Sequence, residues 1–230
     1  MQGLLLVDKP ADWTSFDVVN YVRRIIATAE GKKPKNVKVG HTGTLDPFAT
    51  GLLILLIGKE YTKKAGEFSK LDKTYEVTMK LGISSTTGDP EGKLEAVSDT
   101  IPSPEAVQEA VERFRGQIEQ VPPAFSAIKM GGQRAYKLAR AGKEVKIESR
   151  KVTINRLEIV SYTYPEVKLV ADVSSGTYIR TLVEDIGNVL STGAFTTSLR
   201  RTKIGEFSLQ NAQAKDSLTA EFITENLVEL

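Results

Sequence analysis

The 230-residue chain contains no cysteine and only one histidine, His41. The absence of cysteine excludes disulfide bonds and thiolate zinc sites, and one histidine is too few for a nitrogen-rich metal site. Long apolar runs are also missing. The N-terminal apolar stretch reaches Asp8 and Lys9 too early for a signal peptide, and no later stretch is long enough to span a membrane. We therefore expect a cytoplasmic protein without a bound metal.

Net charge is small as well, +2 at pH 7, but its distribution along the chain is uneven. The segment from Lys129 to Lys151 contains eight basic residues and two acidic ones, whereas beyond Lys215 every charged residue is acidic. Such a segment would give one face of the protein a positive field suited to phosphates, although a charge run is more often a solvated surface. The composition, 40% hydrophobic and 26% charged, suits a globular protein with a sizeable core.

The pattern of polar and apolar residues predicts an α+β domain around a mixed sheet, because strands and helices follow each other without regular alternation. Thr14 and Asp17 form a capping-box pattern before apolar residues at helical spacing. Tyr75 is the first inward-facing residue of the alternating segment 74–81, which is typical of a half-buried strand. Other strands are expected at 52–58, 152–159, 167–173 and, as a pair, 199–209; other helices are expected after Ser103, at 133–141, after Thr177 and at 217–228.

The segment GHTGTLDPFATG, residues 40–51, contains three glycines, the only histidine, and Asp46 directly before Pro47. Pro47 disfavours helical torsions at Asp46 and the glycines permit tight turns, so we expect the carboxylate on a rigid loop. This pattern alone is weak, because Asp-Pro is common turn chemistry and an aspartate there more often caps its own backbone. The segment matches neither the Walker nor the dinucleotide-binding glycine pattern.

Arg180 is a second unusual residue, because it falls in the first turn of the helix expected after Thr177. A cation at a helix N-terminus is electrostatically unfavourable, so this guanidinium needs either solvent or a carboxylate partner. The sequence alone leaves both explanations open.

Seven blocks of the chain, taken together, resemble the TruB family of tRNA pseudouridine-55 synthases. They occur in the family's order over roughly residues 3–210, and the GxLDPxATG block is the most specific of them. The blocks are LLLVDKPADWTSFDVV, GHTGTLDPFATGLL, KTYEVTMKLG, STTGDPEG, PPAFSAIKMGGQRAYKLARAG, SGTYIRTLVEDIG and SLRRTKIGEF.

The resemblance implies the pseudouridine synthase catalytic fold, a mixed and mainly antiparallel sheet flanked by helices and loops, with an active-site cleft across the sheet. It implies an isomerase that converts the T-loop uridine at position 55 of tRNA to pseudouridine without a cofactor. The family's catalytic aspartate falls on Asp46, its arginine partner on Arg180 and its active-site tyrosine on Tyr75.

The same resemblance assigns residues that bind the substrate. Tyr178 and Leu199 match residues that line the uracil pocket, and His41 matches the histidine that helps to prise the target base from the T loop. Lys9 and Pro10 belong to the block that supports the active-site loop.

A basic insert at about residues 124–151 is expected to bind the T arm through Lys129, Arg134, Lys137 and Arg140. We expect one catalytic domain, residues 1–230, because the roughly twenty residues after the last block are too few for the C-terminal PUA domain of most bacterial relatives. Asp12 stands where the family usually has glycine, and Ser175 where it often has lysine. The expected protein is a monomer that acts on tRNA without a protein partner.

Two other functions stay open at this point. A guide-RNA-dependent pseudouridine synthase subunit shares the aspartate segment but depends on a PUA domain. A non-catalytic RNA-binding module would keep the fold alone, but it would not need Asp46, Tyr75 and Arg180 as a set.

The expected role of the insert gives a first testable prediction. Replacing Arg134, Lys137 and Arg140 together by glutamine should weaken RNA binding, because each lost phosphate contact lowers the slope of log affinity against log salt by about 0.7–0.9. The dissociation constant for an unmodified tRNA transcript, measured at several salt concentrations, checks this. An unchanged slope would show that these cations do not contact phosphates.

Overall fold

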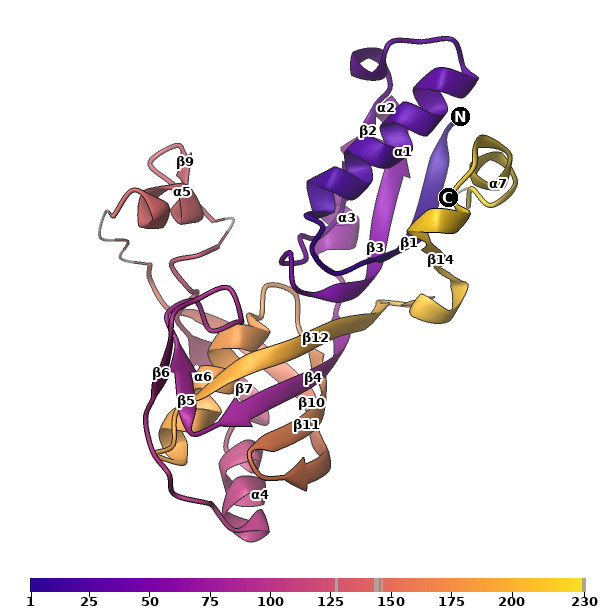
Figure 1. Ribbon diagram of the computed structural model, residues 1–230. Helices are drawn as coiled ribbons and strands as arrows, with labels where there is room; N and C mark the ends of the chain where they lie inside the picture. The colour runs from indigo at the N-terminus through magenta and orange to yellow at the C-terminus, as the bar shows by residue number, and fades with distance from the viewer. Residues whose placement is uncertain (127, 143–144, 146, 229–230) are drawn as a thin grey trace. The chain divides into compact units, whose positions relative to one another are not determined.

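The computed structural model describes residues 1–126, 128–142, 145 and 147–228, without the side chains of Lys129, Met130 and Arg140. These residues form two compact units, Met1–Tyr75 with Arg200–Leu230 as unit 1 and Glu76–Leu199 as unit 2 (Figure 1). The chain passes between the units inside two strands, β4 (Lys73–Leu81) and β12 (Ala194–Ile204).

Unit 1 is built on the strand order β14-β1-β3-β12. Strand β3 (Thr50–Ile57) pairs antiparallel with β1 (Gly3–Lys9) and β2 (Val39–His41), and parallel with β12 at Arg200 and Arg201. The short strand β14 (Gln213–Ala214) pairs parallel with β1, and β13 (Phe207–Ser208) pairs antiparallel with β12. The predicted pair within 199–209 is therefore confirmed.

Both faces of β1 and β3 are buried, which explains why their sequences are almost continuously apolar rather than alternating. On one face, Leu5 and Leu55 pack with Val18 and Val22 of helix α1 (Ser15–Ala29). On the other face the cluster includes Phe68 of α3 (Ala65–Ser69), which follows α2 (Lys59–Lys63).

Helix α1 begins as the sequence predicts. The Asp17 amide donates to Thr14 Oγ1 at 3.1 Å, and the Thr14 amide donates to Asp17 Oδ2 at 2.9 Å, which completes the capping box. After α1 the chain forms a short 3-10 helix, η1 (Pro34–Asn36), before β2.

Unit 2 has the strand order β12-β4-β11-β10-β7. Strand β10 (Arg150–Thr163) pairs antiparallel with both β11 (Glu166–Val173) and β7 (Gly116–Gln120). The helices of this unit are α4 (Pro104–Glu112), α5 (Ala135–Arg140) and α6 (Ile179–Val189), and two small hairpins pair β5 (Ile83–Ser85) with β6 (Leu94–Ala96) and β8 (Lys129–Met130) with β9 (Gln133–Arg134).

The predicted α+β class with a mixed sheet is confirmed, but three local predictions are wrong. Thr177 does not cap α6; its hydroxyl donates to Ser174 O at 2.9 Å, and Tyr178 is the N-cap without a side-chain cap bond. The helix expected at 133–141 begins only at Ala135, because the two preceding residues pair as β9. The last helix, α7 (Ala220–Glu225), is short because the chain returns to β1, where Val228 bridges to Leu4.

Two 3-10 turns, η2 (Leu209–Asn211) and η3 (Lys215–Ser217), connect the end of β13 to α7. Across the described ranges, no helix combines the length and apolarity needed to cross a membrane.

Gly51 shows why a glycine is needed where the predicted loop enters β3. Its φ is +104°, and a Cβ atom at this position would lie 2.3 Å from the carbonyl oxygen of Arg201 on β12. Only glycine therefore permits the close pairing of β3 and β12 at this point.

Candidate active site

The candidate active site of unit 1 is the loop that joins β2 to β3, residues 42–49, which we call the aspartate loop. Its backbone is fixed by Lys9, a residue with 0% exposure at the end of β1. The Lys9 ammonium donates to the carbonyl oxygens of Pro10 at 2.8 Å, Trp13 at 2.6 Å and Pro47 at 3.1 Å. Pro47 directly follows Asp46, so the ammonium fixes the backbone next to the carboxylate.

The start of α1 makes a second set of contacts with the aspartate loop. The Leu45 amide donates to Ser15 Oγ at 2.8 Å, and the Ser15 hydroxyl lies 3.2 Å from the Leu45 carbonyl oxygen, to which it donates. The Asp12 amide donates to Pro47 O at 2.9 Å. Asp12 has a φ of +62°, a region that suits glycine, the residue that the resemblance leads one to expect here, and that aspartate tolerates better than most other residues.

Arg201 connects the start of the aspartate loop to strand β3, although no pattern in the sequence singled it out. Its side chain is buried, its Nε donates to Leu52 O at 2.8 Å, and its Nη2 donates to Gly43 O at 3.1 Å. The neighbouring Arg200 instead forms a partly exposed ion pair with Asp8 at 2.7 Å. The alternation of side chains along a strand could have indicated a buried arginine here, because two adjacent strand residues point to opposite faces of the sheet.

Two buried cations therefore lie beside the loop and affect each other. The pKa of Lys9 is lowered to about 8, mainly by burial; the Asp46 carboxylate opposes this shift and the Arg201 charge adds to it. The attraction between Lys9 and Asp46 is mutual, so it favours the ionised carboxylate.

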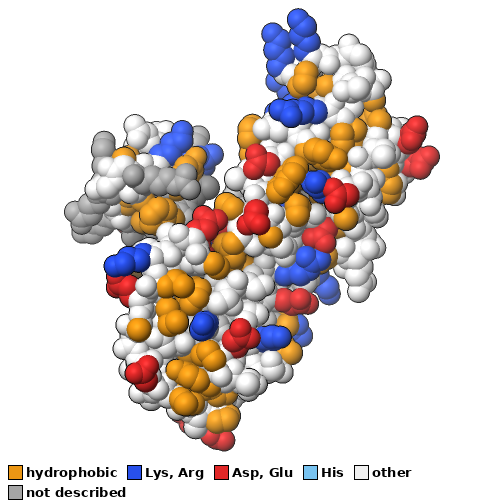
Figure 2. Space-filling model, in the orientation of Figure 1, with side chains coloured by type: hydrophobic (Ala, Val, Ile, Leu, Met, Phe, Trp, Pro, Cys, Tyr) orange, Lys and Arg blue, Asp and Glu red, His pale blue; other side chains and the backbone are white. Residues whose placement is uncertain are grey.

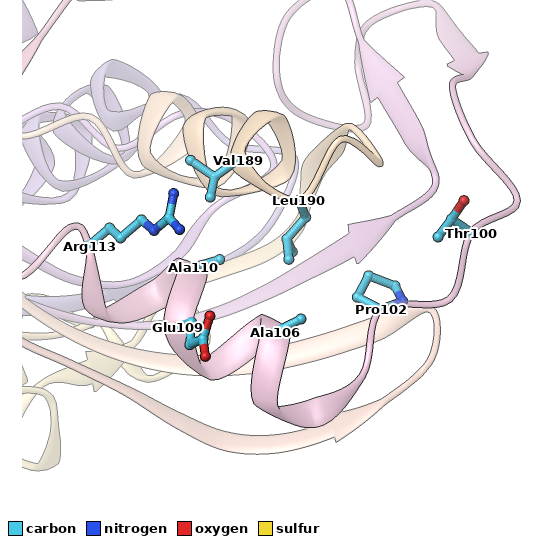
Figure 3. A pocket seen from close by; sticks show the side chains of 8 residues that line it. All are labelled: Thr100, Pro102, Ala106, Glu109, Ala110, Arg113, Val189 and Leu190. Atoms are coloured by element: carbon cyan, nitrogen blue, oxygen red, sulfur yellow. The ribbon is translucent and has the colours of Figure 1, made fainter.

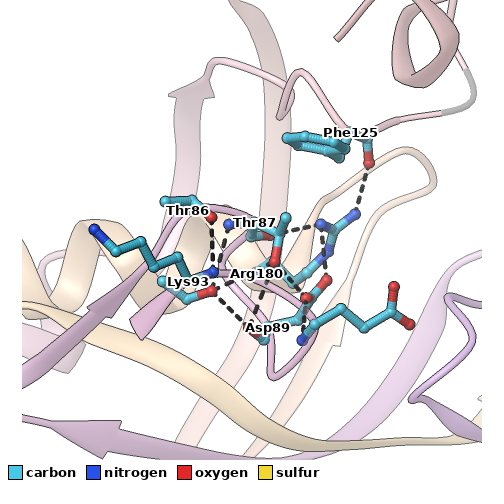
Figure 4. A network of polar contacts seen from close by, with 8 residues as sticks. Thr86, Thr87, Asp89, Lys93, Phe125 and Arg180 are labelled. Carbon is cyan, nitrogen blue, oxygen red and sulfur yellow. Dashed lines mark hydrogen bonds and ion pairs between the residues drawn. The ribbon is translucent and has the colours of Figure 1, made fainter. Parts of the chain in front are cut away.

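Arg180 is the centre of a polar network in unit 2 (Figure 4). Its side chain is only 4% exposed, and its Nη1 lies 3.1 Å from Oδ2 of Asp89. Nη1 also donates to Thr87 O at 2.7 Å, and Nη2 donates to Phe125 O at 2.9 Å. Of the two explanations that the sequence left open, the carboxylate partner is therefore correct and the solvent-exposed arginine is wrong.

The segment STTGDPEG folds around this guanidinium. Thr87 Oγ1 donates to Asp89 Oδ1 at 2.5 Å, and the Glu91 amide donates to the same oxygen at 3.0 Å. Gly88 has a φ of +72°, and a Cβ atom there would lie 2.6 Å from Glu184 Oε1. Burial raises the pKa of Glu184, and the nearby Arg180 charge opposes this shift. Asp89 was missed because its Asp-Pro pair has the pattern of an ordinary exposed turn.

Tyr178 and Leu199 also belong to unit 2. The Tyr178 amide donates to Gln120 Oε1 at 2.7 Å, and Gln120 Nε2 donates to the Tyr178 carbonyl oxygen at 3.0 Å. The guanidinium carbon of Arg150 lies 4.9 Å from the centre of the Tyr178 ring. Leu199 is buried in β12. The structure thus places Tyr178 two residues before Arg180, with its backbone fixed by a buried glutamine.

The remaining predicted residues are distributed over both units. His41 in β2 is partly buried and pairs with Leu55, and Tyr75 in β4 is buried; both belong to unit 1. In unit 2, Arg134 and Lys137 are exposed near α5, whereas the side chains of Lys129 and Arg140 lie outside the described residues. Asp46 and Arg180 belong to different units, and their pairing stays a prediction.

A groove of about 310 Å³ lies in unit 2 between α4 and the end of α6 (Figure 3). It contains none of the predicted site residues; its lining is Thr100, Pro102, Ala106, Glu109, Ala110, Arg113, Val189 and Leu190. In the part of the chain that the structure describes, no group of three or more acidic or histidine side chains is arranged to hold a metal ion.

Comparisons with known proteins give the class of the chain. The family model of the TruB family pseudouridylate synthase N-terminal domain matches residues 30–179, and that of the tRNA pseudouridylate synthase B C-terminal domain matches residues 180–229. "tRNA pseudouridine synthase B" of Pseudomonas aeruginosa (strain UCBPP-PA14) is 46% identical over 218 residues, which are 95% of this chain and 69% of the relative. The protein of the same name from Mycobacterium sp. (strain KMS) is 46% identical over 224 residues, 95% of this chain and 72% of the relative.

Solved structures share the fold of this chain. A chain in a crystal structure of a Cbf5-Nop10-Gar1 complex has a TM-score of 0.69 and 25% identity, over 99% of this chain and 57% of the matched chain. A structure of an H/ACA RNP bound to a substrate RNA containing 2'-deoxyuridine, at 23% identity and a TM-score of 0.69, shares the fold.

The fold and the matches together define a pseudouridine synthase. More particularly, the chain belongs to the TruB family, and the predicted enzyme class, a tRNA pseudouridine synthase, is confirmed. The predicted single-domain organisation and the absence of a PUA domain stay predictions, because these relatives are longer than the present chain.

The buried ion pair of Arg180 gives a testable prediction. Asp89→Ala should lower the free energy of unfolding by about 3–5 kcal/mol, because it breaks a buried ion pair by removing one of its two members. Glu95→Ala is the matched control: Glu95 pairs with Lys93 at 2.8 Å, but both side chains are exposed, so the loss should stay below about 1 kcal/mol. Chemical denaturation of both variants measures the difference. Equal losses would contradict a structural role for the Asp89 pair.

Proposed function

We propose that this enzyme converts the T-loop uridine at position 55 of tRNA to pseudouridine, with Asp46 as the catalytic carboxylate. The observation that supports this most strongly is the position of Asp46 in the family's GxLDPxATG block, on a loop whose backbone is bound by buried Lys9 and Arg201. An aspartate that only capped a turn would not require two buried cations for its support.

The reaction breaks the N1–C1′ bond of the uridine and forms a C5–C1′ bond, while C5 loses a proton and N1 gains one. Atoms and electrons balance without a redox step, so no cofactor is needed. The Asp46 carboxylate would attack C1′ of the ribose or C6 of the base, or would remove the C2′ proton on a glycal route. All three routes require the ionised carboxylate, which the Lys9 charge favours.

Arg180 is the proposed partner of Asp46. A guanidinium offers five N–H donors in a fixed plane, so an arginine positioned by Asp89 can also serve a second carboxylate. In this arrangement Asp89 would position Arg180, and Arg180 would orient Asp46.

The target base must leave the T loop before it can react, at a cost of a few kcal/mol. We assign His41 to this step, because a flat ring next to the aspartate loop can replace the departing base in the stack. Tyr75, Tyr178 and Leu199 are the proposed uracil pocket, in which Tyr75 would stack on the extruded ring and move a proton. Lys9 is fully buried, so its proposed role is to support the loop rather than to touch RNA.

The insert at 124–151 is the proposed T-arm contact, and the exposure of Arg134 and Lys137 is consistent with it. A cytoplasmic monomer that needs no protein partner stays part of this proposal.

The test is to map pseudouridine chemically in an unmodified tRNA transcript after incubation with the protein. Asp46→Asn should lower product formation by at least about 10²–10⁴-fold, because the nucleophile or base is lost, with little change in tRNA affinity. Asp216→Asn, the same chemical change at a side chain that is 87% exposed, is the control and should leave the rate unchanged.

Each alternative outcome has a definite meaning. Full activity of Asp46→Asn would refute its catalytic role, and product at another position would refute the assignment to uridine 55. A wild-type protein that binds tRNA but modifies none would indicate the non-catalytic module.

A further inference from the structure

The basic segment between α1 and β2 has no role in the function proposed so far. Residues 32–38, KKPKNVK, contain four lysines, and all four are exposed. We call this segment the lysine turn. In Figure 2, blue side chains gather at the end of unit 1 where α1 leads into β2, the place of the lysine turn in Figure 1.

The charge of the lysine turn is mostly uncompensated. Lys32 pairs with Glu30 at 2.8 Å, and the same carboxylate also contacts the N-terminal amino group. Among residues 1–126, 128–142, 145 and 147–228, no ion pair involves Lys33, Lys35 or Lys38. Three neighbouring ammonium groups without counter-charge repel each other, so a polyanion would lower the free energy of this surface.

The lysine turn is nevertheless well ordered by its backbone. The Lys32 amide donates to Ala27 O at 2.8 Å, and the Val37 amide donates to Pro34 O at 3.1 Å. Val37 is only 7% exposed and belongs to the core cluster around α1. The Gly58 amide donates to Lys38 O at 2.8 Å, which ties the end of the turn to β3. A fixed backbone presents the three lysines without a large cost in chain entropy.

The lysine turn is also continuous with the candidate active site of unit 1. Strand β2 runs directly from the turn to His41, and three strand residues cover roughly 10 Å. Arg23 of α1 donates from Nη2 to Val39 O at 3.0 Å, which adds another cation along this strand.

We propose that the lysine turn is a second phosphate-binding surface of the enzyme, which contacts the backbone of the bound RNA through Lys33, Lys35 and Lys38. Lysine ammonium groups act there as point charges, so they position the RNA and do not specify its sequence. This inference rests on the proposed function for the identity of the polyanion, and it adds a contact region separate from the 124–151 insert.

The experiment compares two triple variants with equal charge change. The test variant carries Lys33→Gln, Lys35→Gln and Lys38→Gln. The control variant carries Lys93→Gln, Lys168→Gln and Lys203→Gln, all exposed lysines outside the turn. For each protein, the dissociation constant of an unmodified tRNA transcript is measured at several salt concentrations, together with the single-turnover rate of pseudouridine formation at saturating enzyme.

The test variant should bind tRNA at least about tenfold more weakly at low salt, with a salt slope reduced by about 2–3, while its rate at saturation is unchanged. The control should lose distinctly less affinity and slope. A test variant that equals the control would overturn the proposal, and so would a lower saturated rate with unchanged affinity.

Failure of the proposed function would look different. If the wild-type protein forms no pseudouridine but the test variant still shows the weaker, less salt-dependent binding, the phosphate surface stands and the catalytic assignment fails.

Discussion

The buried ammonium of Lys9 is the interaction on which the candidate active site of unit 1 depends. It donates to carbonyl oxygens at the end of β1, at the start of α1 and in the aspartate loop, so one charge fixes three chain segments together. Removing a charge from water is expensive, and here three carbonyl acceptors use the three donor hydrogens of an ammonium and offset part of that cost. Arg201 adds a second cation, which binds the start of the loop at Gly43 and strand β3 at Leu52.

Two like charges in a buried region are unfavourable to each other, which is why the Arg201 charge lowers the pKa of Lys9 beyond the effect of burial. An anion at Asp46 relieves this repulsion, so the support of the loop and the charge of the proposed catalytic group favour each other. The pKa of Lys9 is about 8 in the folded protein and about 10.5 in the unfolded chain. As pH rises, the folded protein therefore loses this proton at a lower pH than the unfolded chain does. The Lys9 contribution to the free energy of unfolding therefore increases between about pH 8 and 10.5. Over the same range the Lys9 side chain changes from an ammonium with three N–H donors to an amine with two.

The sequence allowed correct prediction of features that depend on neighbouring residues. The capping box of α1, the alternating strand β4 and the glycine-rich loop around Asp46 are local patterns, and the family blocks identified the enzyme class. The contacts of Arg180 were not predictable in this way, because Thr87 and Phe125, whose carbonyl oxygens accept from it, lie 93 and 55 residues away in the chain. Thr177 was assigned wrongly as a cap because its hydroxyl has a competing acceptor in Ser174, a contact that only the folded turn creates.

Whether a buried cation fixes the loop that carries the proposed catalytic aspartate is tested most directly by Lys9→Met with Lys73→Met as its control. Lys73 is also buried with a pKa lowered to about 8, but it donates to Ser69 O and Leu71 O and makes no contact with the aspartate loop. The measurement is the single-turnover rate of pseudouridine formation at saturating enzyme, at a temperature where both variants are folded. Lys9→Met should lower this rate at least about tenfold with tRNA affinity unchanged, since a misplaced catalytic group is costly, whereas Lys73→Met should keep the rate. A Lys9→Met enzyme as fast as Lys73→Met would contradict the claim.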